Sequence, residues 1–164
     1  MKTILSIDPA LKNLAITKIT FDDDNTIIDI DVKLVDIMKI KKPSFEKLMS
    51  NLKLELDKLI IEDVDSVIIE NQPSRMNMRV KSVAIAIYTY FMINNKHVAF
   101  VSPSIKLTNE ENKLTYKERK NKSVEKTFLI LNDHLKETIN TFKKKDDICD
   151  CILMASRWIE RSIA

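Results

Sequence analysis

The sequence predicts an α/β fold in which helices cover both faces of a mixed five-stranded sheet. Three stretches of strand-forming residues occupy the first 35 positions and are joined by short connections, which is typical of an antiparallel meander. Two later strand-like stretches alternate with helical patterns, which favours parallel pairing. The 164 residues are enough for one domain with a sizeable core, so we expect a single domain over residues 1–164.

The first strand is the centre of the predicted sheet. Its sequence TILSID is apolar on both faces, and Pro9 ends it because proline lacks an N–H and disfavours a helical residue before it. Asp8 is therefore presented at the carboxyl end of a central strand, where open α/β sheets place their sites. Strands at 14–21 and 26–35 follow. The DDDN segment between them indicates a solvated hairpin turn, because the spaced ligands of a calcium loop are missing.

Capping and periodicity predict the remaining elements. Ser44 is a suitable N-cap for a helix whose apolar stripe packs on the sheet, and the next strand, at 64–70, ends on a second carboxylate, Glu70. Pro103 stops the fifth strand, which begins at His97. Three further helices are expected, at 80–94, 123–135 and 146–161. The polar, aperiodic stretch 104–120 is a long loop for a compact domain and is therefore a candidate for function.

The helix predicted at 80–94 is unusual because residues 83–93 are apolar nearly all the way round. Such a helix needs cover on two sides: its own sheet and something else. A symmetric partner subunit would supply the second cover, and so would burial inside the monomer. The sequence leaves both alternatives open.

Composition excludes several classes of function. Hydrophobic residues make up 45% and charged residues 31%, as in folded proteins that work in water. The chain has no glycine, so it has no glycine-rich phosphate loop, and we expect no nucleotide cofactor. No apolar run reaches the length of a membrane span, and the N-terminus leads directly into a strand, so neither a membrane anchor nor a signal peptide is expected. The net charge of +3 does not by itself indicate nucleic acid.

Cys149 and Cys151 are the two cysteines of the chain. They are too close in sequence for an ordinary disulfide framework and lack nearby partners for zinc. We expect them to pack as small apolar side chains in a protein of a reducing, intracellular compartment.

Four carboxylates carry the chemical prediction. Asp8 and Glu70 end strands, whereas Asp147 and Asp150 lie three residues apart on one face of a helix's first turn. Helix capping explains one or two acidic residues there, but not their repetition beside two strand-end carboxylates. If the four converge, each pair about 4 Å apart repels by about 4 kcal/mol, against a typical domain stability of about 5–15 kcal/mol. The cluster then needs protonation or divalent cations.

The type of ligand indicates which cations. Oxygen ligands without histidine or cysteine favour Mg²⁺, with Mn²⁺ able to substitute. Two such ions about 3.5–4 Å apart form a clamp for in-line displacement at phosphorus. The carboxylates therefore predict phosphodiester hydrolysis.

Basic residues form two candidate DNA-binding groups. The first lies just before the helix expected to begin at Ser123, where cations and backbone N–H groups suit a phosphate. A solvated charge run is the alternative, and the neighbouring acidic cluster favours DNA binding. The second group follows Glu70. The two groups consist of Tyr116, Lys117, Arg119, Lys120, Lys122 and Ser123, and of Arg75, Arg79 and Lys81.

In the order of these elements the chain resembles the ribonuclease H-like nucleases. More narrowly, it resembles the RuvC-type Holliday-junction resolvases, above all their poxvirus-type viral branch. Five segments carry the resemblance, in the family's order and over nearly the whole chain. They are SIDP with KNLA, IIENQP, VSP, YKERKNKSVE and KDDICD.

The resemblance implies that Asp8, Glu70, Asp147 and Asp150 are the metal-binding catalytic carboxylates, with Asp146 as a neighbour. It also implies a Mg²⁺-dependent homodimer that nicks two strands of a four-way DNA junction symmetrically, in the host-cell cytoplasm if the protein is viral. Two positions depart from the bacterial pattern. Ala10 stands where glycine usually follows the Asp-Pro pair, and Cys149 stands where alanine is common.

Two other functions fit the same fold. One is a less selective nuclease that cuts flaps, Y-junctions or RNA–DNA hybrids. The other is a non-catalytic DNA-binding scaffold. The complete set of carboxylates argues against the scaffold, because a protein without metal chemistry gains nothing from their mutual repulsion.

Overall fold

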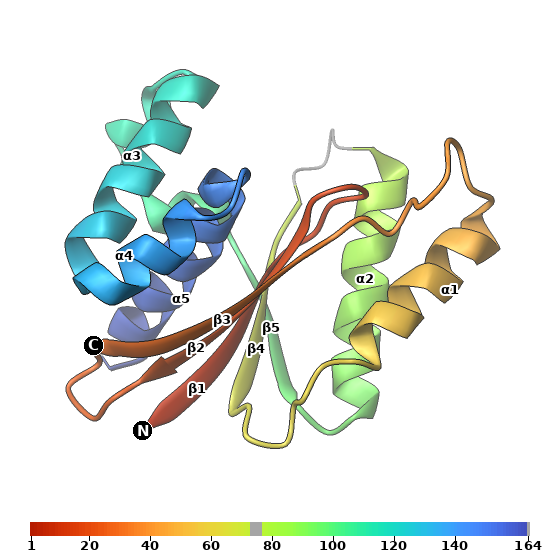
Figure 1. The fold of residues 1–164 in the computed structure, drawn as a ribbon, viewed down its shortest axis with the longest axis horizontal. Coiled ribbons are helices and arrows are strands. Elements are labelled where there is room, and N and C mark those ends of the chain that lie inside the picture. Colours follow the sequence, from red (N-terminus) through yellow and green to blue (C-terminus); the bar gives the residue numbers. More distant parts are fainter. Residues whose placement is uncertain (73–76, 164) are drawn as a thin grey trace.

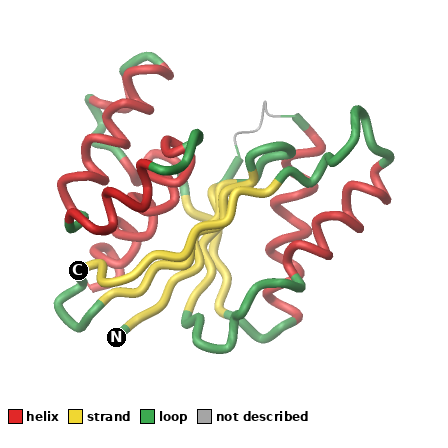
Figure 2. Tube along the Cα trace, in the orientation of Figure 1, coloured by secondary structure: helices red, strands yellow, loops and turns green. Residues whose placement is uncertain are grey.

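The computed structural model describes residues 1–72 and 77–163 and shows a mixed sheet between two layers of helices (Figure 1). The strand order is β3-β2-β1-β4-β5. Helices α1 and α2 cover one face of the sheet, and α3, α4 and α5 cover the other (Figures 1 and 2). The predicted fold class is confirmed.

The strands are β1 (Lys2–Asp8), β2 (Leu14–Phe21), β3 (Ile27–Val35), β4 (Ser66–Glu70) and β5 (His97–Val101). The α-helices are α1 (Phe45–Leu56), α2 (Met78–Ile93), α3 (Tyr116–Ile130), α4 (Asp133–Asn140) and α5 (Lys145–Ile163).

Strand β1 lies at the centre of the sheet, as predicted. It pairs antiparallel with β2 over its whole length and parallel with β4. Ile4 packs in the core under α5, whereas Leu5 and Ile7 pack in the core under α1 and α2. Because both faces of β1 are buried, its apolar run has no polar alternation, and its register against both neighbours is fixed.

The turn between β2 and β3 is a hairpin turn, as predicted. The Asp22 carboxylate accepts hydrogen bonds from the backbone N–H groups of Asp24 and Thr26, at 3.0 and 2.8 Å. Asn25 adopts a φ of 61°, a conformation that asparagine tolerates better than most residues. In a chain without glycine, asparagine therefore supplies the left-handed residue of this turn.

The region after β5 is more structured than predicted. Two short 3₁₀ helices, Pro103–Lys106 and Glu111–Lys113, interrupt the expected loop, and α3 begins at Tyr116 instead of Ser123. The reason is a capping box: the Thr115 hydroxyl accepts from the Glu118 N–H, and the Glu118 carboxylate accepts from the Thr115 N–H at 2.9 Å. This local pair starts a helix where apolar periodicity gives no signal.

The single helix predicted at 123–135 is also wrong. Helix α3 ends at Ile130, and Asn132 caps a separate helix, α4, by accepting a hydrogen bond from the Leu135 N–H at 2.9 Å. Side-chain capping at Asn132 therefore divides the expected helix into two.

Helix α2 has one face buried and one face exposed. Its buried side chains include Val83, Ile87 and Phe91, whereas Ile85 and Ile93 are 61% and 70% exposed. Burial of this helix inside the monomer, one of the two alternatives, is thus wrong. The apolar composition of α2 does not make it a membrane span: among the residues described, no helix is both long and apolar enough to cross a bilayer.

Candidate active site

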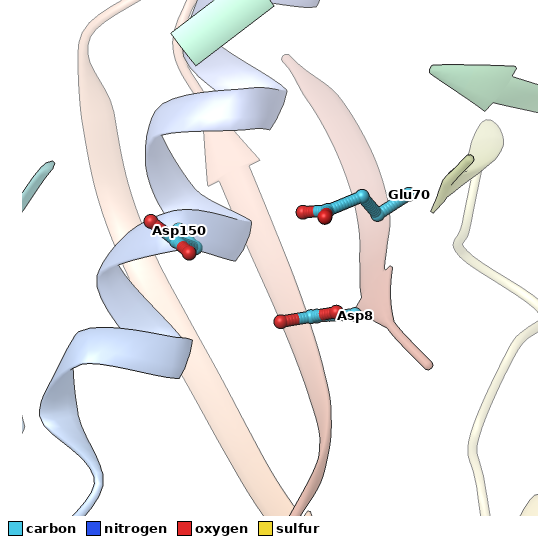
Figure 3. A group of neighbouring side chains, drawn as sticks. All are labelled: Asp8, Glu70 and Asp150. Atoms are coloured by element: carbon cyan, nitrogen blue, oxygen red, sulfur yellow. The ribbon is translucent and has the colours of Figure 1, made fainter. Parts of the chain in front are cut away.

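Three carboxylates from three separate elements meet at one edge of the sheet. Asp8 is the last residue of β1, Glu70 is the last residue of β4, and Asp150 lies in α5. Each offers a ligand oxygen, and these oxygens all lie within 4.8 Å of one another (Figure 3). The pairing of Ile7 with Ile69 brings the first two together, because parallel neighbours end at the same edge of a sheet.

Helix α5 is attached to the sheet next to this cluster. The Ser6 hydroxyl donates a 2.7 Å hydrogen bond to the carbonyl oxygen of Cys151, and the Cys151 thiol lies 3.8 Å from the Ala15 carbonyl oxygen. Both cysteines are free and buried, so they pack as small apolar side chains, as expected. The small side chain at 151 allows the helix to approach β1 and β2 closely enough for Asp150 to reach Asp8 and Glu70.

Asp147 lies one helical turn before Asp150, outside the group of three. Its Oδ1 accepts a 2.8 Å hydrogen bond from Lys120 Nζ, which also donates to Asp150 Oδ2 at 2.7 Å and lies 3.8 Å from Asp146 Oδ2. One ammonium group thus contacts both aspartates, which confirms that they share a helix face. The structure brings three of the four predicted carboxylates together and connects the fourth to them through Lys120.

Sequence reasoning missed Lys106, which is part of the cluster. Its side chain is only 9% exposed, and its Nζ lies 2.8 Å from Glu70 Oε2 and 3.1 Å from Asp150 Oδ2. It belongs to the 3₁₀ helix that Pro103 begins directly after β5. Because β5 is the parallel neighbour of β4, a residue one turn past its end reaches the edge where Glu70 lies. The sequence signal for Lys106 is Pro103, which ends β5 and begins the short helix that carries this lysine.

Gln72 is a second residue of this site that sequence reasoning missed. Its Nε2 lies 3.4 Å from Asp8 Oδ1 and 3.5 Å from the Pro9 carbonyl oxygen. A weak hydrogen bond from this amide holds the Asp8 side chain toward Glu70. Gln72 follows Glu70 by two residues, so the end of β4 supplies the Glu70 carboxylate and also contacts the Asp8 carboxylate.

The pKa values reflect the crowding of charge. Burial and the negative charge of Glu70 raise the pKa of Asp8 to about 8, although Lys106 and Lys120 act in the opposite direction. Burial acts to raise the pKa of Asp150 as well, but the two lysines outweigh it and lower that pKa below its usual range. In the metal-free protein Asp150 is therefore ionised at neutral pH, and Asp8 largely keeps its proton.

The donor set fits a hard divalent cation. Asp8, Glu70 and Asp150 offer only oxygen, which suits Mg²⁺ and Mn²⁺ better than softer metals. The raised pKa of Asp8 shows that the two lysines do not offset the combined effect of burial and the negative charge of Glu70. A divalent cation would relieve it, so these residues fit the ion that the sequence predicted.

Part of the first basic group lies beside the carboxylates. Lys120 lines an open hollow of about 680 Å³, and Tyr116 and Lys117 contribute to the same wall. Lys120 Nζ also lies 5.9 Å from the centre of the Tyr116 ring. Lys143 and Lys145, which sequence reasoning did not assign to DNA binding, line the hollow as well. The hollow therefore gathers cationic and aromatic side chains beside Asp146, and Lys120 connects it to the acidic cluster.

The other members of the first group are placed differently. Lys122 forms a 2.7 Å ion pair with Glu125, and Arg119 is partly exposed on α3. The expectation that Ser123 opens a helix is wrong, because Ser123 lies in the middle of α3 and is 1% exposed. Its side chain helps to lower the pKa of Asp150, yet its hydroxyl makes no hydrogen bond of good geometry within the described residues. Ser123 is thus buried next to Asp150 and is not exposed at the surface that DNA could contact.

The second basic group lies near the start of α2. Arg79 donates a 3.1 Å hydrogen bond to the Pro43 carbonyl oxygen, and Lys81 is half-buried on the same helix. Arg75 lies outside the described residues. The structure therefore places two of the three predicted residues on α2, away from the hollow that α3 lines.

The mixed five-stranded sheet, with carboxylates at the ends of β1 and β4 and on the last helix, has a ribonuclease H-like fold. Residues 2–162 match the protein family described as "Poxvirus A22 protein". The chain belongs to this family. It is also 31% identical, over 149 residues, to the uncharacterized protein L451 of Acanthamoeba polyphaga mimivirus. That match covers 74% of this chain but spans only 36% of the length of the relative.

Solved structures share the fold. The fowlpox virus resolvase, determined in complex with its substrate Holliday junction DNA, superimposes with a TM-score of 0.71 at 20% identity, over 99% of both chains. The yeast mitochondrial Holliday junction resolvase Ydc2 gives 0.65 at 18% identity, over 96% of this chain and 79% of its own. RuvC of Thermus thermophilus in complex with a Holliday junction substrate gives 0.67 at 12% identity, over 98% of this chain and 95% of its own.

Proposed function

We propose that this protein is a Holliday-junction resolvase, an endonuclease that uses divalent metal ions to nick four-way DNA junctions symmetrically. The observation that carries the proposal is the meeting of three ligand oxygens, from Asp8, Glu70 and Asp150, within 4.8 Å of one another. Membership of the poxvirus A22 family supports it. The fowlpox virus and Thermus thermophilus proteins of the same fold were both determined with junction DNA, which supports branched DNA as the substrate class.

The carboxylates hold the metal ions in this proposal. Asp8, Glu70 and Asp150 would supply oxygens for one ion, and Asp147 together with Asp150 would hold a second. Mg²⁺ is the expected ion, and Mn²⁺ would substitute for it. When bound, such a pair of ions activates water and stabilises the leaving oxygen at the scissile phosphate. The protein contributes rigid placement, because two of the ligands end the buried strands β1 and β4, and the others lie on α5, which packs on β1 and β2.

The hollow beside the carboxylates is the proposed path of the DNA backbone. Lys117, Lys120, Lys143 and Lys145 offer cations there, and Tyr116 offers an exposed ring. Contacts of this kind recognise phosphate groups and shape more than base sequence. Binding should therefore weaken with salt, by roughly 0.9 log units per phosphate contact for each log unit of salt concentration.

The exposed face of α2 supports a homodimer. Ile85, Met92 and Ile93 are each more than half exposed on a helix whose opposite face is fully packed. A two-fold partner that buries this face would remove a contiguous apolar surface from water. Two copies of the site would then face two strands of one junction, as symmetric nicking requires.

Cleavage of a synthetic four-way junction tests the proposal. Wild-type protein with Mg²⁺ should nick two opposing strands at symmetric positions when the products of each strand are mapped, and linear duplex should be cut far more slowly. Asp8→Asn should abolish cleavage while junction binding survives, and Asp31→Asn, at an exposed position of β3, should cut normally. Equal rates on junction and duplex would instead indicate a less selective nuclease. Junction binding without any metal-dependent cleavage would indicate a DNA-binding scaffold.

We also place the protein in a reducing compartment, and in the host-cell cytoplasm if it is viral. The support is that Cys149 and Cys151 are both unpaired and buried. Burial raises the pKa of the Cys149 thiol to about 12, so the reactive thiolate form is rare there at neutral pH.

A further inference from the structure

Lys120 contacts the proposed metal-binding carboxylates and also lines the proposed path of the DNA backbone. Its Nζ donates to Asp147 Oδ1 and Asp150 Oδ2 at 2.8 and 2.7 Å, so it sits between the two carboxylates that would hold a second ion. The same side chain lines the open hollow, where we place the DNA backbone. A phosphate group in that hollow therefore comes within reach of an ammonium group that is already bound to metal ligands.

We propose that Lys120 takes the place of a second divalent cation in the DNA-free protein, and that a DNA phosphate group frees this place by accepting the ammonium group. The inference rests on the proposed function and adds the control of its metal site by the substrate. The protein then binds one ion readily on its own and a second ion only when DNA is in place.

Of the two lysines in the cluster, only Lys120 lines the hollow, so we assign the exchange between carboxylates and DNA phosphate to Lys120. Lys106 lies between Glu70 and Asp150, has a side chain 9% exposed, and does not line the hollow. Its ammonium group therefore has no nearby position from which to meet DNA without leaving the interior. Lys120 already lines the hollow, so rotation about its side-chain bonds is enough to move its ammonium group from the carboxylates to a phosphate group there.

The charges of the site agree with one ion in the absence of DNA. Asp8, Glu70, Asp147 and Asp150 carry four negative charges when all are ionised, Asp146 adds a fifth 3.8 Å from Lys120, and the two lysines return two positive charges. One divalent cation offsets most of the remainder. A second ion leaves an excess of positive charge unless an anion arrives with it, and the phosphate groups of DNA are that anion.

The exchange makes metal binding and DNA binding cooperative. If phosphate binding opens the second ion site, then the second ion must strengthen DNA binding by the same factor, because such coupling is reciprocal. A nuclease regulated in this way assembles its complete metal pair only around a substrate.

Counting bound Mn²⁺ tests the inference without measuring cleavage. The electron paramagnetic resonance signal of free Mn²⁺ is followed while the ion is titrated into DNA-free protein at fixed pH. Wild-type protein should bind one ion per chain, with a second only at much higher concentration. Lys120→Met should bind the second ion about tenfold or more tightly, within the usual range for coupled sites. Lys113→Met, in the second 3₁₀ helix and paired with Glu110, should behave as wild type.

Two further samples make the test specific. Lys120→Met combined with Asp147→Asn should lose the second ion again, because Asp147 is one of its proposed ligands. In samples frozen before cleavage, junction DNA should tighten the second ion in wild-type protein but not in Lys120→Met, after subtraction of Mn²⁺ bound to DNA alone. Lys120→Gln replaces Lys120→Met if melting by circular dichroism shows that the latter does not fold.

The outcomes separate the two proposals. Equal numbers and affinities of Mn²⁺ in wild-type protein and in the Lys120 variants would overturn the exchange while leaving metal-dependent cleavage intact. Failure of every variant to bind any Mn²⁺ would overturn the proposed function, and the exchange with it.

Discussion

Asparagine in place of Asp8 should make the metal-free protein more stable while it abolishes cleavage. The Asp8 carboxyl group is buried beside Glu70, and its pKa is raised from 3.8 to about 8. Asparagine has nearly the same shape but never ionises, so it removes both the cost of burying a charge and the repulsion from Glu70. Its side-chain oxygen can still accept the hydrogen bond that Gln72 now donates at 3.4 Å.

The size of the effect follows from proton linkage. The unfolded chain loses the Asp8 proton near pH 3.8, whereas the folded chain keeps it until about pH 8. Between these values the folded state binds more protons, so its free energy of unfolding falls as the pH rises and levels off above pH 8. Each pH unit costs about 1.4 kcal/mol, which gives an upper limit of about 4 kcal/mol at pH 7. Because the largely buried Asp8 side chain keeps some contact with solvent, we expect Asp8→Asn to gain about 2–4 kcal/mol.

Thermal unfolding in EDTA measures this gain. For a chain of this size it corresponds to a rise in Tm of about 4–16 °C at pH 7, with almost no difference from wild type at pH 4. Added Mg²⁺ should raise the Tm of wild type more than that of Asp8→Asn, because it binds the intact ligand set. Asp31→Asn is the control and should be unchanged. A variant that is less stable than wild type at pH 7, or a gain that does not depend on pH, would refute the raised pKa of the buried Asp8 carboxyl group.

Three other perturbations test separate parts of the structure. The hydrogen bond from Lys126 lowers the pKa of Glu111 to about 2, so this pair stabilises the protein fully above about pH 4.5 and loses its effect as the pH falls toward 2. Both side chains are 20% exposed, so Glu111→Gln should cost about 1 kcal/mol in urea unfolding at pH 7 and little near pH 2. Ile85→Glu should convert the proposed dimer to monomers in sedimentation experiments, whereas Ile60→Glu, at a 73% exposed position outside α2, should leave the mass unchanged. Ser123→Ala removes a buried hydroxyl that lacks a good hydrogen bond, so it should cost less than about 0.5 kcal/mol; a loss above about 2 kcal/mol would show that the hydroxyl has a partner.

The errors in the predicted helices have a common physical origin. Residues 116–122 are polar and show no apolar stripe, so periodicity predicts a loop. The capping box between Thr115 and Glu118 starts α3 there regardless of hydrophobic pattern, and Asn132 divides the next segment in the same way. These signals were present in the sequence, but a capping pattern occurs in many loops as well. Only the packing of α3 on α5 decides that this one starts a helix.

The sequence alone determined where the carboxylates of Asp8 and Glu70 would lie. An apolar, β-branched run that ends on an acidic residue is a local pattern, and parallel pairing then brings the two strand ends to one edge. It also determined that Asp147 and Asp150 share a helix face, because the helical repeat fixes that relation within one turn.

The tertiary structure decided which cations stand among these carboxylates. Lys106 contacts Glu70 across 36 residues of sequence, and Lys120 contacts Asp150 across 30. Contacts of this range depend on how a 3₁₀ helix and α3 dock against α5, and no local pattern encodes that docking. The same docking places the Lys120 ammonium group between Asp147 and Asp150.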